Sequence, residues 1–214
     1  MQTLSNDFDK LPLSPLSQYE VKGSKFLGFG VKIALVDSTN SAQSNPLQNA
    51  LDILKQAHPK AVHFVYAFRS MNSLGQILER SSDDGEPKGS SGQPCLNVLR
   101  GWDLVDFGII IVRYFGGVKL GVGGLVKAYS KATLEALNTL ESSSFLIPFE
   151  LEKQLHLRIK YSELNALKYV IKNHNLTIAH QEFLHQFVEI TLRGGESNIA
   201  LFNAWTKENQ HLFM

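Results

Sequence analysis

The sequence predicts an α+β protein built from two domains. Its 214 residues exceed the commonest length of a single domain, and 43% of them are hydrophobic, which is enough to bury a core. Strand-like and helix-like patterns alternate along the chain, and a segment with three consecutive serines interrupts them. We therefore expect a loose arm over residues 1–15, a first domain over 16–142, a linker over 143–150 and a second domain over 151–214.

The first domain begins with two strands. Apolar and polar residues interleave from Tyr19 to Val36 around a tight turn at Lys22–Lys25. Asn45-Pro46 then combines a capping side chain with a first-turn proline, so a helix should start there and end at His58-Pro59. The following elements are expected to be strands at Val62–Phe68 and Gly75–Glu79, a short helix at Gln93–Leu99, a buried strand at Asp106–Phe115 and a long helix from Gly123.

The second domain shows a simpler pattern. Its expected elements, in order, are a strand at Leu151–Ile159, a helix at Ser162–Asn173, strands at Leu176–Leu184 and Phe187–Leu192, a helix at Ser197–Lys207 and a short apolar tail. The order β-α-β-β-α-(β) is that of a ferredoxin-like split βαβ unit.

Composition restricts the possible partners. The formal net charge is only +1, so a nucleic-acid-binding surface would have to be a local patch. The single cysteine, Cys95, cannot form an internal disulfide, which fits a reducing compartment. No segment has the pattern of a signal peptide or a membrane-spanning helix, so we expect a cytoplasmic protein that does not associate with a membrane.

A glycine-rich segment joins the buried strand to the long helix. It places Gly121, Gly123 and Gly124 at the expected helix start, between Lys119 and Lys127. Unpaired N–H groups and the positive end of the helix dipole attract anions, so these residues, with Arg113, are predicted to bind phosphate or nucleic acid. The alternative is that the glycines only allow the helix to lie close to the sheet.

The segment before the short helix carries three carboxylates, Asp83, Asp84 and Glu86. Such oxygen-rich groups can hold Mg²⁺, but adjacent aspartates in a turn also bind their own backbone or cap the next helix. The residues that follow form a polar loop, with Lys88, Ser90 and Ser91, whose amides and hydroxyls could cradle an anion.

The remaining candidates are weaker. His58 and His63 flank the expected start of a strand, but zinc would need a third ligand, so we interpret them as polar neighbours and predict no metal and no cofactor. Cys95 has no identified histidine partner that would activate it as a nucleophile. The run Arg113-Tyr114-Phe115 interleaves basic and aromatic groups, which stack bases and pair phosphates where they are exposed.

These motifs resemble the signature of the IMPACT family, also called the YigZ family. The resemblance covers most of residues 16–140, and its specific motifs are Ser82–Pro87, Gly89–Pro94, Val112–Gly117 and Leu120–Tyr129. His58-Pro59 with Ala61 and His63 also resembles the family's histidine segment. Bacterial members often carry a second histidine after the first in that strand, where this chain has Phe64, so a two-histidine role is not expected here.

The resemblance implies a fold and a field of activity. The first domain should be of the left-handed βαβ type found in a small-subunit ribosomal protein and in translational GTPases. The second should be similar to the last domain of elongation factor G, which is the bacterial arrangement. Eukaryotic relatives regulate translation by competing for an activator of the amino-acid-starvation kinase.

Two hypotheses about function follow. The first is a non-enzymatic binding protein of translation whose partner is RNA, the ribosome or a translation-related protein, with the glycine-rich segment as its phosphate site. The second is a metal-assisted hydrolase or phosphoryl-transfer enzyme that uses Asp83, Asp84 and Glu86.

Overall fold

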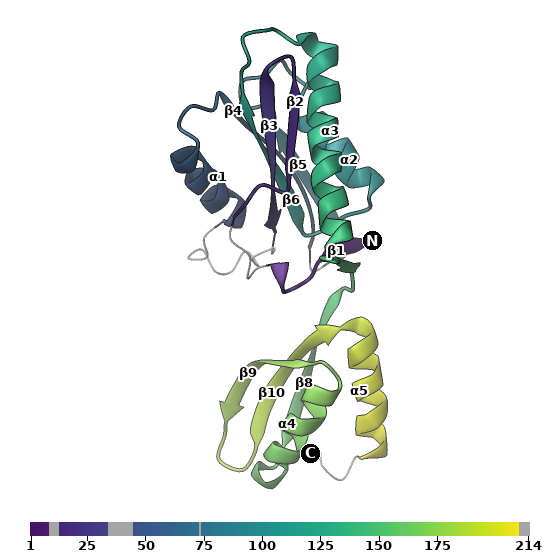
Figure 1. The fold of residues 1–214 in the computed structure, drawn as a ribbon. Helices are drawn as coiled ribbons and strands as arrows, with labels where there is room; N and C mark the ends of the chain where they lie inside the picture. The colour runs from purple at the N-terminus through teal and green to yellow at the C-terminus, as the bar shows by residue number, and fades with distance from the viewer. Residues whose placement is uncertain (9–12, 34–44, 73, 210–214) are drawn as a thin grey trace. The chain divides into compact units, whose positions relative to one another are not determined.

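The protein consists of two compact units, Met1–Phe149 and Glu150–Met214. The computed structural model describes residues 1–8, 13–33, 45–72 and 74–209 (Figure 1). The boundary between the units falls within the segment 143–150, where the sequence predicts a linker. Each unit has its own sheet and hydrophobic core, and the α+β class is confirmed.

An antiparallel sheet of five strands forms the centre of the N-terminal unit. In spatial order the strands are β2 (Ser17–Val21), β3 (Ser24–Lys32), β6 (Phe107–Tyr114), β4 (His63–Met71) and β5 (Ile77–Ser82). The part of the expected second strand at residues 34–36 lies outside the described residues. In the middle of the sheet, β6 packs Ile109 and Ile111 into one core and Ile110 and Val112 into the other. A continuous apolar run is typical of a strand that is buried on both faces.

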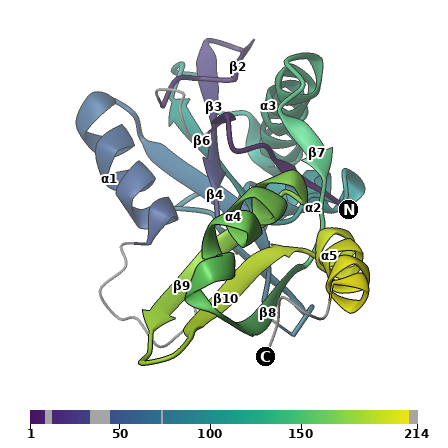
Figure 2. The ribbon, with the colours of Figure 1, turned by 90° about the horizontal axis from the view of Figure 1, so that it is seen from below.

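Helices cover both faces of this sheet (Figure 2). One face carries α1 (Pro46–Ala57), which starts where the Asn45 side chain accepts a hydrogen bond from the N–H of Leu47. The other face carries α2 (Gly92–Gly101) and the 22-residue α3 (Gly121–Ser142). Even so, among the residues that the structure describes, no helix is long and apolar enough to cross a bilayer.

The two crossover connections of the sheet have opposite hands. Strands β3 and β4 are both antiparallel to β6, so they are parallel to each other and α1 connects them on one face. Strands β5 and β6 are also parallel to each other, but they run opposite to β3 and β4. Their connection crosses the sheet in the opposite sense to the connection from β3 to β4, and its helix α2 lies on the other face. Each of the three differences, in strand direction, crossing sense and face, reverses the handedness of a crossover, so together they make the two connections opposite in hand. One crossover is therefore left-handed, although right-handed crossovers dominate in proteins, and this confirms the fold that the family resemblance implies.

The N-terminal segment differs from the expected loose arm. Residues Gln2–Leu4 form β1, which pairs with β7 (Leu146–Pro148) from within the expected linker. Leu4 is 1% exposed and belongs to the core beneath α2 and α3. The arm is held because this apolar side chain fills the core while its backbone completes a two-stranded ladder, and a three-residue strand leaves almost no periodicity in a sequence.

The C-terminal unit follows the predicted order of elements. It contains β8 (Glu152–Ile159), the short 3₁₀ helix η2 (Tyr161–Glu163), α4 (Leu164–Asn173), β9 (Thr177–Phe183), β10 (Val188–Gly195) and α5 (Glu196–Glu208). The described strands lie in the order β8-β10-β9. This order matches the first, third and second strands of a ferredoxin-like fold. The apolar tail at residues 210–214 lies outside the described residues.

Candidate functional site

The loop after β5 wraps around the carboxylate of Asp83. Its two oxygens accept hydrogen bonds from the N–H groups of Gly89, Ser91 and Gly92, at 2.7 to 3.1 Å, and from the Ser91 hydroxyl at 2.7 Å. Burial would raise the pKa of this carboxyl, but the hydrogen bonds outweigh burial and lower the pKa below its usual value. Because α2 starts at Gly92, Asp83 also caps this helix from outside.

The predicted anion cradle is therefore occupied by the protein's own carboxylate. Ser90 and Ser91 are buried, and the amides around them point to Asp83 rather than to solvent. Of the polar loop residues, Lys88 stays exposed. The sequence predicted that this loop binds a negative charge, but it could not show that the charge is the carboxylate of Asp83, eight residues before Ser91.

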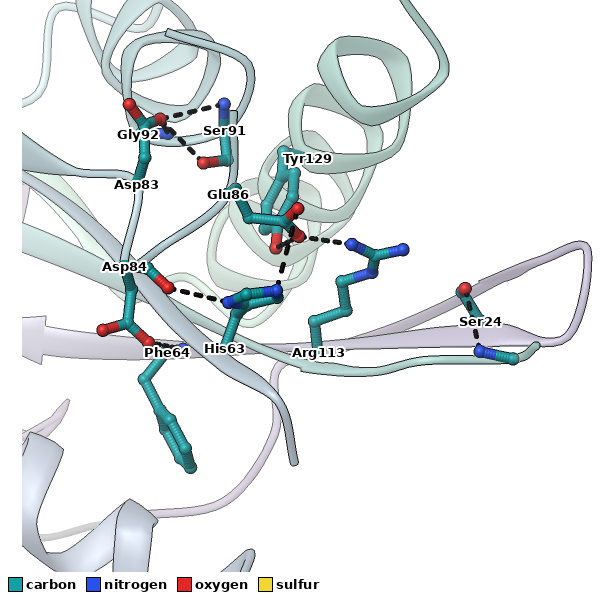
Figure 3. Close-up of polar contacts among 11 residues, drawn as sticks. Ser24, His63, Phe64, Asp83, Asp84, Glu86, Ser91, Gly92, Arg113 and Tyr129 are labelled. Carbon is teal, nitrogen blue, oxygen red and sulfur yellow. Dashed lines mark hydrogen bonds and ion pairs between the residues drawn. The ribbon is translucent and has the colours of Figure 1, made fainter. Parts of the chain in front are cut away.

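Asp84 fastens this acidic loop (residues 83–91) to the beginning of β4. It adopts a φ of 45°, followed by Gly85 at 85°, so the chain reverses sharply. Its Oδ2 accepts a hydrogen bond from the N–H of Phe64 at 2.6 Å. Its carbonyl oxygen accepts one from Nδ1 of His63 at 2.7 Å. Figure 3 shows both contacts on the left of the site.

Glu86 reaches from the loop into a buried polar cluster, which consists of Glu86, Arg113 and Tyr129 (Figure 3). Its Oε1 accepts a hydrogen bond from Nη1 of Arg113 at 2.5 Å and another from the Tyr129 hydroxyl at 2.7 Å. The side chains of Glu86 and Arg113 are only 3% and 6% exposed. Burial and the hydrogen bond to Glu86 both raise the pKa of Tyr129, so this phenol stays protonated.

The strand register explains why these groups meet. Arg113 of β6 lies opposite Phe26 of β3 and opposite His63 of β4. Paired residues share a face of the sheet, so all three lie under α3, where Tyr129 contacts Phe26 edge-on. Nε2 of His63 lies 3.8 Å from Oε2 of Glu86. The cluster joins β6, α3 and the acidic loop, and His63 adds a contact from β4.

The surroundings of Arg113 favour a structural role over the predicted contact with an external phosphate. Arg113 is 5% exposed, and its charge is neutralised by Glu86. Its guanidinium also lies 5.4 Å from the ring centroid of Phe26. Within the described residues its Nε has no hydrogen-bond partner. The burial of Arg113 could have been predicted from the sequence, because Arg113 directly follows the apolar run of a strand that is buried on both faces.

The acidic residues do not converge on a common point. Asp83 accepts from loop amides, Asp84 from an amide of β4 and Glu86 from the buried cluster. His58 lies on the other face of the sheet, where Nδ1 is 2.8 Å from the Tyr114 hydroxyl. In the part of the chain that the structure describes, no three His, Cys, Asp or Glu side chains are grouped to hold a metal ion. The hydrogen bonding of the carboxylates favours a structural role over metal-assisted hydrolysis.

Cys95 is no more suited to catalysis. Its side chain is buried in the core beneath α2 and α3. Burial raises the pKa of the Cys95 thiol to about 12, so the reactive thiolate is scarce at neutral pH.

The glycine-rich segment contains glycines of two kinds. A Cβ at Gly116 would lie 1.9 Å from the carbonyl carbon of Gly23, so this glycine lets two turns touch. Gly117 and Gly121 have φ values of 84° and 72°, and a Cβ on either, or on Gly123, would meet nothing within 4 Å. Gly116 therefore allows two turns to pack closely, which is not the predicted packing of the helix on the sheet, whereas the helix start at Gly121–Gly123 lies open to solvent.

The open helix start retains the other predicted cations. Lys119 and Lys127 are exposed, as are Gly121 and Gly123, and Gly124 is half-buried. The residue before the helix is Leu120, and no side chain among the described residues caps the first turn of α3. Lys119, Lys127 and the three glycines therefore remain candidates for an anion site, whereas the buried ion pair of Arg113 argues against its inclusion.

We expect Gly116→Ala to destabilise the N-terminal unit by about 2–3 kcal/mol, because its methyl group would collide with backbone that cannot rotate away. Gly123→Ala is the matched control. Its Cβ meets open space within a helix, so this change should be neutral or stabilising by up to about 1 kcal/mol. Urea denaturation of both variants checks the prediction, and a Gly116→Ala protein as stable as the wild type contradicts it.

Together, the fold and the site define a two-domain α+β protein whose N-terminal unit fastens an acidic loop to a sheet through a buried Glu–Arg–Tyr cluster. The model of the Impact N-terminal domain matches residues 22–137. The chain therefore belongs to the IMPACT family.

Known relatives agree with this assignment. An IMPACT family member of Haemophilus influenzae is 32% identical over 152 residues, which cover 71% of each chain. A member from Thermus thermophilus is 36% identical over 146 residues, which cover 67% of this chain and 75% of the relative. The crystal structure of a hypothetical protein aligns over 95% of this chain and 96% of its own with a TM-score of 0.64 at 24% identity, which shows a shared fold.

Proposed function

We propose that this protein is a non-enzymatic binding protein of translation that contacts RNA or the ribosome through the start of α3. The observation that carries the proposal is the exposed first turn of α3, which has no side-chain cap and which lies between exposed Lys119, two residues before the helix, and exposed Lys127 in the next turn. Four N–H groups at a helix start have no partner within the helix, and the helix dipole adds partial positive charge there. A phosphate group would satisfy both.

The two helices on this face of the sheet support the proposal by contrast. The N–H groups at the start of α2 are already bound by the Asp83 carboxylate. At the start of α3, the described residues supply no comparable acceptor, and the adjacent side chains are cationic. The N–H groups at the start of α3 are thus available to an external anion, whereas those at the start of α2 donate to Asp83.

The link to translation rests on the family. Eukaryotic members regulate translation, and this chain belongs to the same family through its N-terminal domain. The proposed partner is therefore a phosphate-bearing component of the translation apparatus in the cytoplasm. Neither a cofactor nor a catalytic group enters the proposal.

We expect the wild-type protein to bind an RNA that contains duplex and single-stranded segments, with an affinity that falls steeply between about 50 and 200 mM salt. The double variant Lys119→Glu/Lys127→Glu should bind at least about tenfold more weakly, with a salt slope that is smaller by about 1–2. Fluorescence anisotropy of the labelled RNA across the salt series measures both quantities.

The matched control is Lys168→Glu/Lys172→Glu on α4, which changes the net charge equally at two exposed positions of the other unit. This control should bind nearly as the wild type does. Equal losses in the two double variants would mean that only net charge matters, and would count against the helix start of α3 as the site.

A further inference from the structure

An exposed aromatic ring lies in the segment that leads from β6 to α3. Phe115 follows the last residue of β6 and is 48% exposed, and Val118 and Val122 in the next turns are 50% and 58% exposed. Gly116 touches the turn at Lys22-Gly23, and its N–H donates to the Ser24 hydroxyl at 3.1 Å. We call the exposed group formed by Lys22, Phe115, Val118, Lys119 and Val122 the Phe115 surface.

The Phe115 ring contacts a buried arginine. The guanidinium of Arg113 lies 5.8 Å from its ring centroid. Arg113 in turn is buried and held by Glu86 at 2.5 Å (Figure 3). The residue is nevertheless 48% exposed, so Phe115 contacts a buried cation and remains accessible from solvent.

The exposed charged residues of the two turns at this ring have a single sign. The turn at residues 21–24 carries Lys22, the segment 115–124 carries Lys119, and neither contains an aspartate or glutamate. The contact between Gly23 and Gly116 brings the two segments together. In a chain with a net charge of +1, this is a local concentration of positive charge.

An exposed ring among cations matches the requirements of single-stranded nucleic acid. Bases in a duplex are stacked on each other, whereas an unpaired base has a free face that can stack on an aromatic side chain. Lysines beside the ring can meet the phosphates on either side of that base. A purely apolar protein partner would gain nothing from the lysines and would have to desolvate them.

We propose that the Phe115 surface binds single-stranded RNA, with one base stacked on Phe115 and the flanking phosphates near Lys22 and Lys119. This rests on the proposed function, because it names the kind of RNA that the same end of the domain recognises. It adds a contact that senses the base rather than the backbone, and it extends the site from α3 to the β2–β3 turn.

The test compares two RNA probes in fluorescence anisotropy: a labelled oligoadenylate of about 15 nucleotides, within the usual site size of single-strand binders, and a blunt RNA duplex with a similar number of phosphates. We expect the single strand to bind at least about tenfold more tightly than the duplex. Phe115→Ala should remove most of this preference, Phe115→Trp should retain it, and Lys22→Glu should weaken the binding of both probes.

The control is Phe183→Ala, which removes a ring that is 60% exposed in the C-terminal unit and should leave both affinities unchanged. Because Phe115 also contacts Arg113, the thermal unfolding of each variant is recorded, and Phe115→Trp keeps the test valid even if the alanine variant is destabilised.

The outcomes separate this inference from the proposed function. Equal binding of both probes, with no effect of Phe115→Ala but a loss in Lys119→Glu/Lys127→Glu, overturns the inference and leaves the proposed function standing. An absence of RNA binding overturns both. If a protein cross-links to the surface in a Phe115-dependent manner while RNA does not bind, the occupant is a protein and the inference is wrong.

Discussion

Replacing Glu86 with alanine should lower the free energy of unfolding of the N-terminal unit by about 3–5 kcal/mol, the usual cost of removing one partner from a buried ion pair. The loss is large because Arg113 would remain buried at 5% exposure without a counter-charge. The Tyr129 hydroxyl would lose its acceptor as well. Urea denaturation of the full chain, with amide hydrogen exchange to identify the unit that opens, measures the effect.

The control for this prediction is Glu135→Ala, which breaks a pair between half-buried Glu135 and exposed Lys131 at 3.4 Å on the same helix as Tyr129. Such pairs contribute at most about 1 kcal/mol. A double variant, Glu86→Leu/Arg113→Met, should recover much of the loss, because two apolar side chains leave no unpaired charge. A Glu86→Ala protein within about 1 kcal/mol of the wild type would show that the cluster does not hold the acidic loop.

The fold was predictable where its signals are local. The long helix follows from apolar side chains at a 3.6-residue period, which places Tyr129 on the buried stripe. The start of α1 follows from Asn45-Pro46, whose cap is observed. Strand β1 was not predictable, because its pairing with residues 146–148 depends on where the end of α3 lies in space.

The candidate site was predictable only in part, because its decisive contacts are long-range. The sequence shows that Glu86 and Arg113 exist, but 27 residues separate them, and their meeting depends on the register between β4 and β6. Strand alternation adds that Arg113 shares its face with Ile111 and Ile109, which are fully buried. A cation in such a position requires a buried carboxylate, and this rule would have selected Arg113 as a structural residue.

Replacing Asp83 with alanine should cost about 2–4 kcal/mol at neutral pH. Four hydrogen bonds end on this carboxylate, and each hydrogen bond to a charged group contributes about 1.5–3 kcal/mol without full additivity. The change would leave the buried N–H groups of Ser91 and Gly92 without acceptors at the start of α2. Asp83→Asn should cost less, because its amide oxygen still accepts while the charge is lost.

The pH dependence distinguishes the charge of Asp83 from its shape. The folded-state pKa of this carboxyl is lower than its unfolded value, so its contribution is fully present above the unfolded pKa, which is about 3.9, and is lost as the pH falls through the folded pKa. The stability difference between the wild type and Asp83→Asn should therefore be constant from pH 7 to about 5 and should shrink below about pH 4. Urea denaturation across this range measures it, with the exposed Asp52→Asn on α1 as a control within about 0.5 kcal/mol of the wild type. A difference that persists undiminished in acid would contradict this prediction, because a protonated carboxyl and an amide are both uncharged and present the same acceptor oxygen to the loop, so the difference could not come from the charge of Asp83.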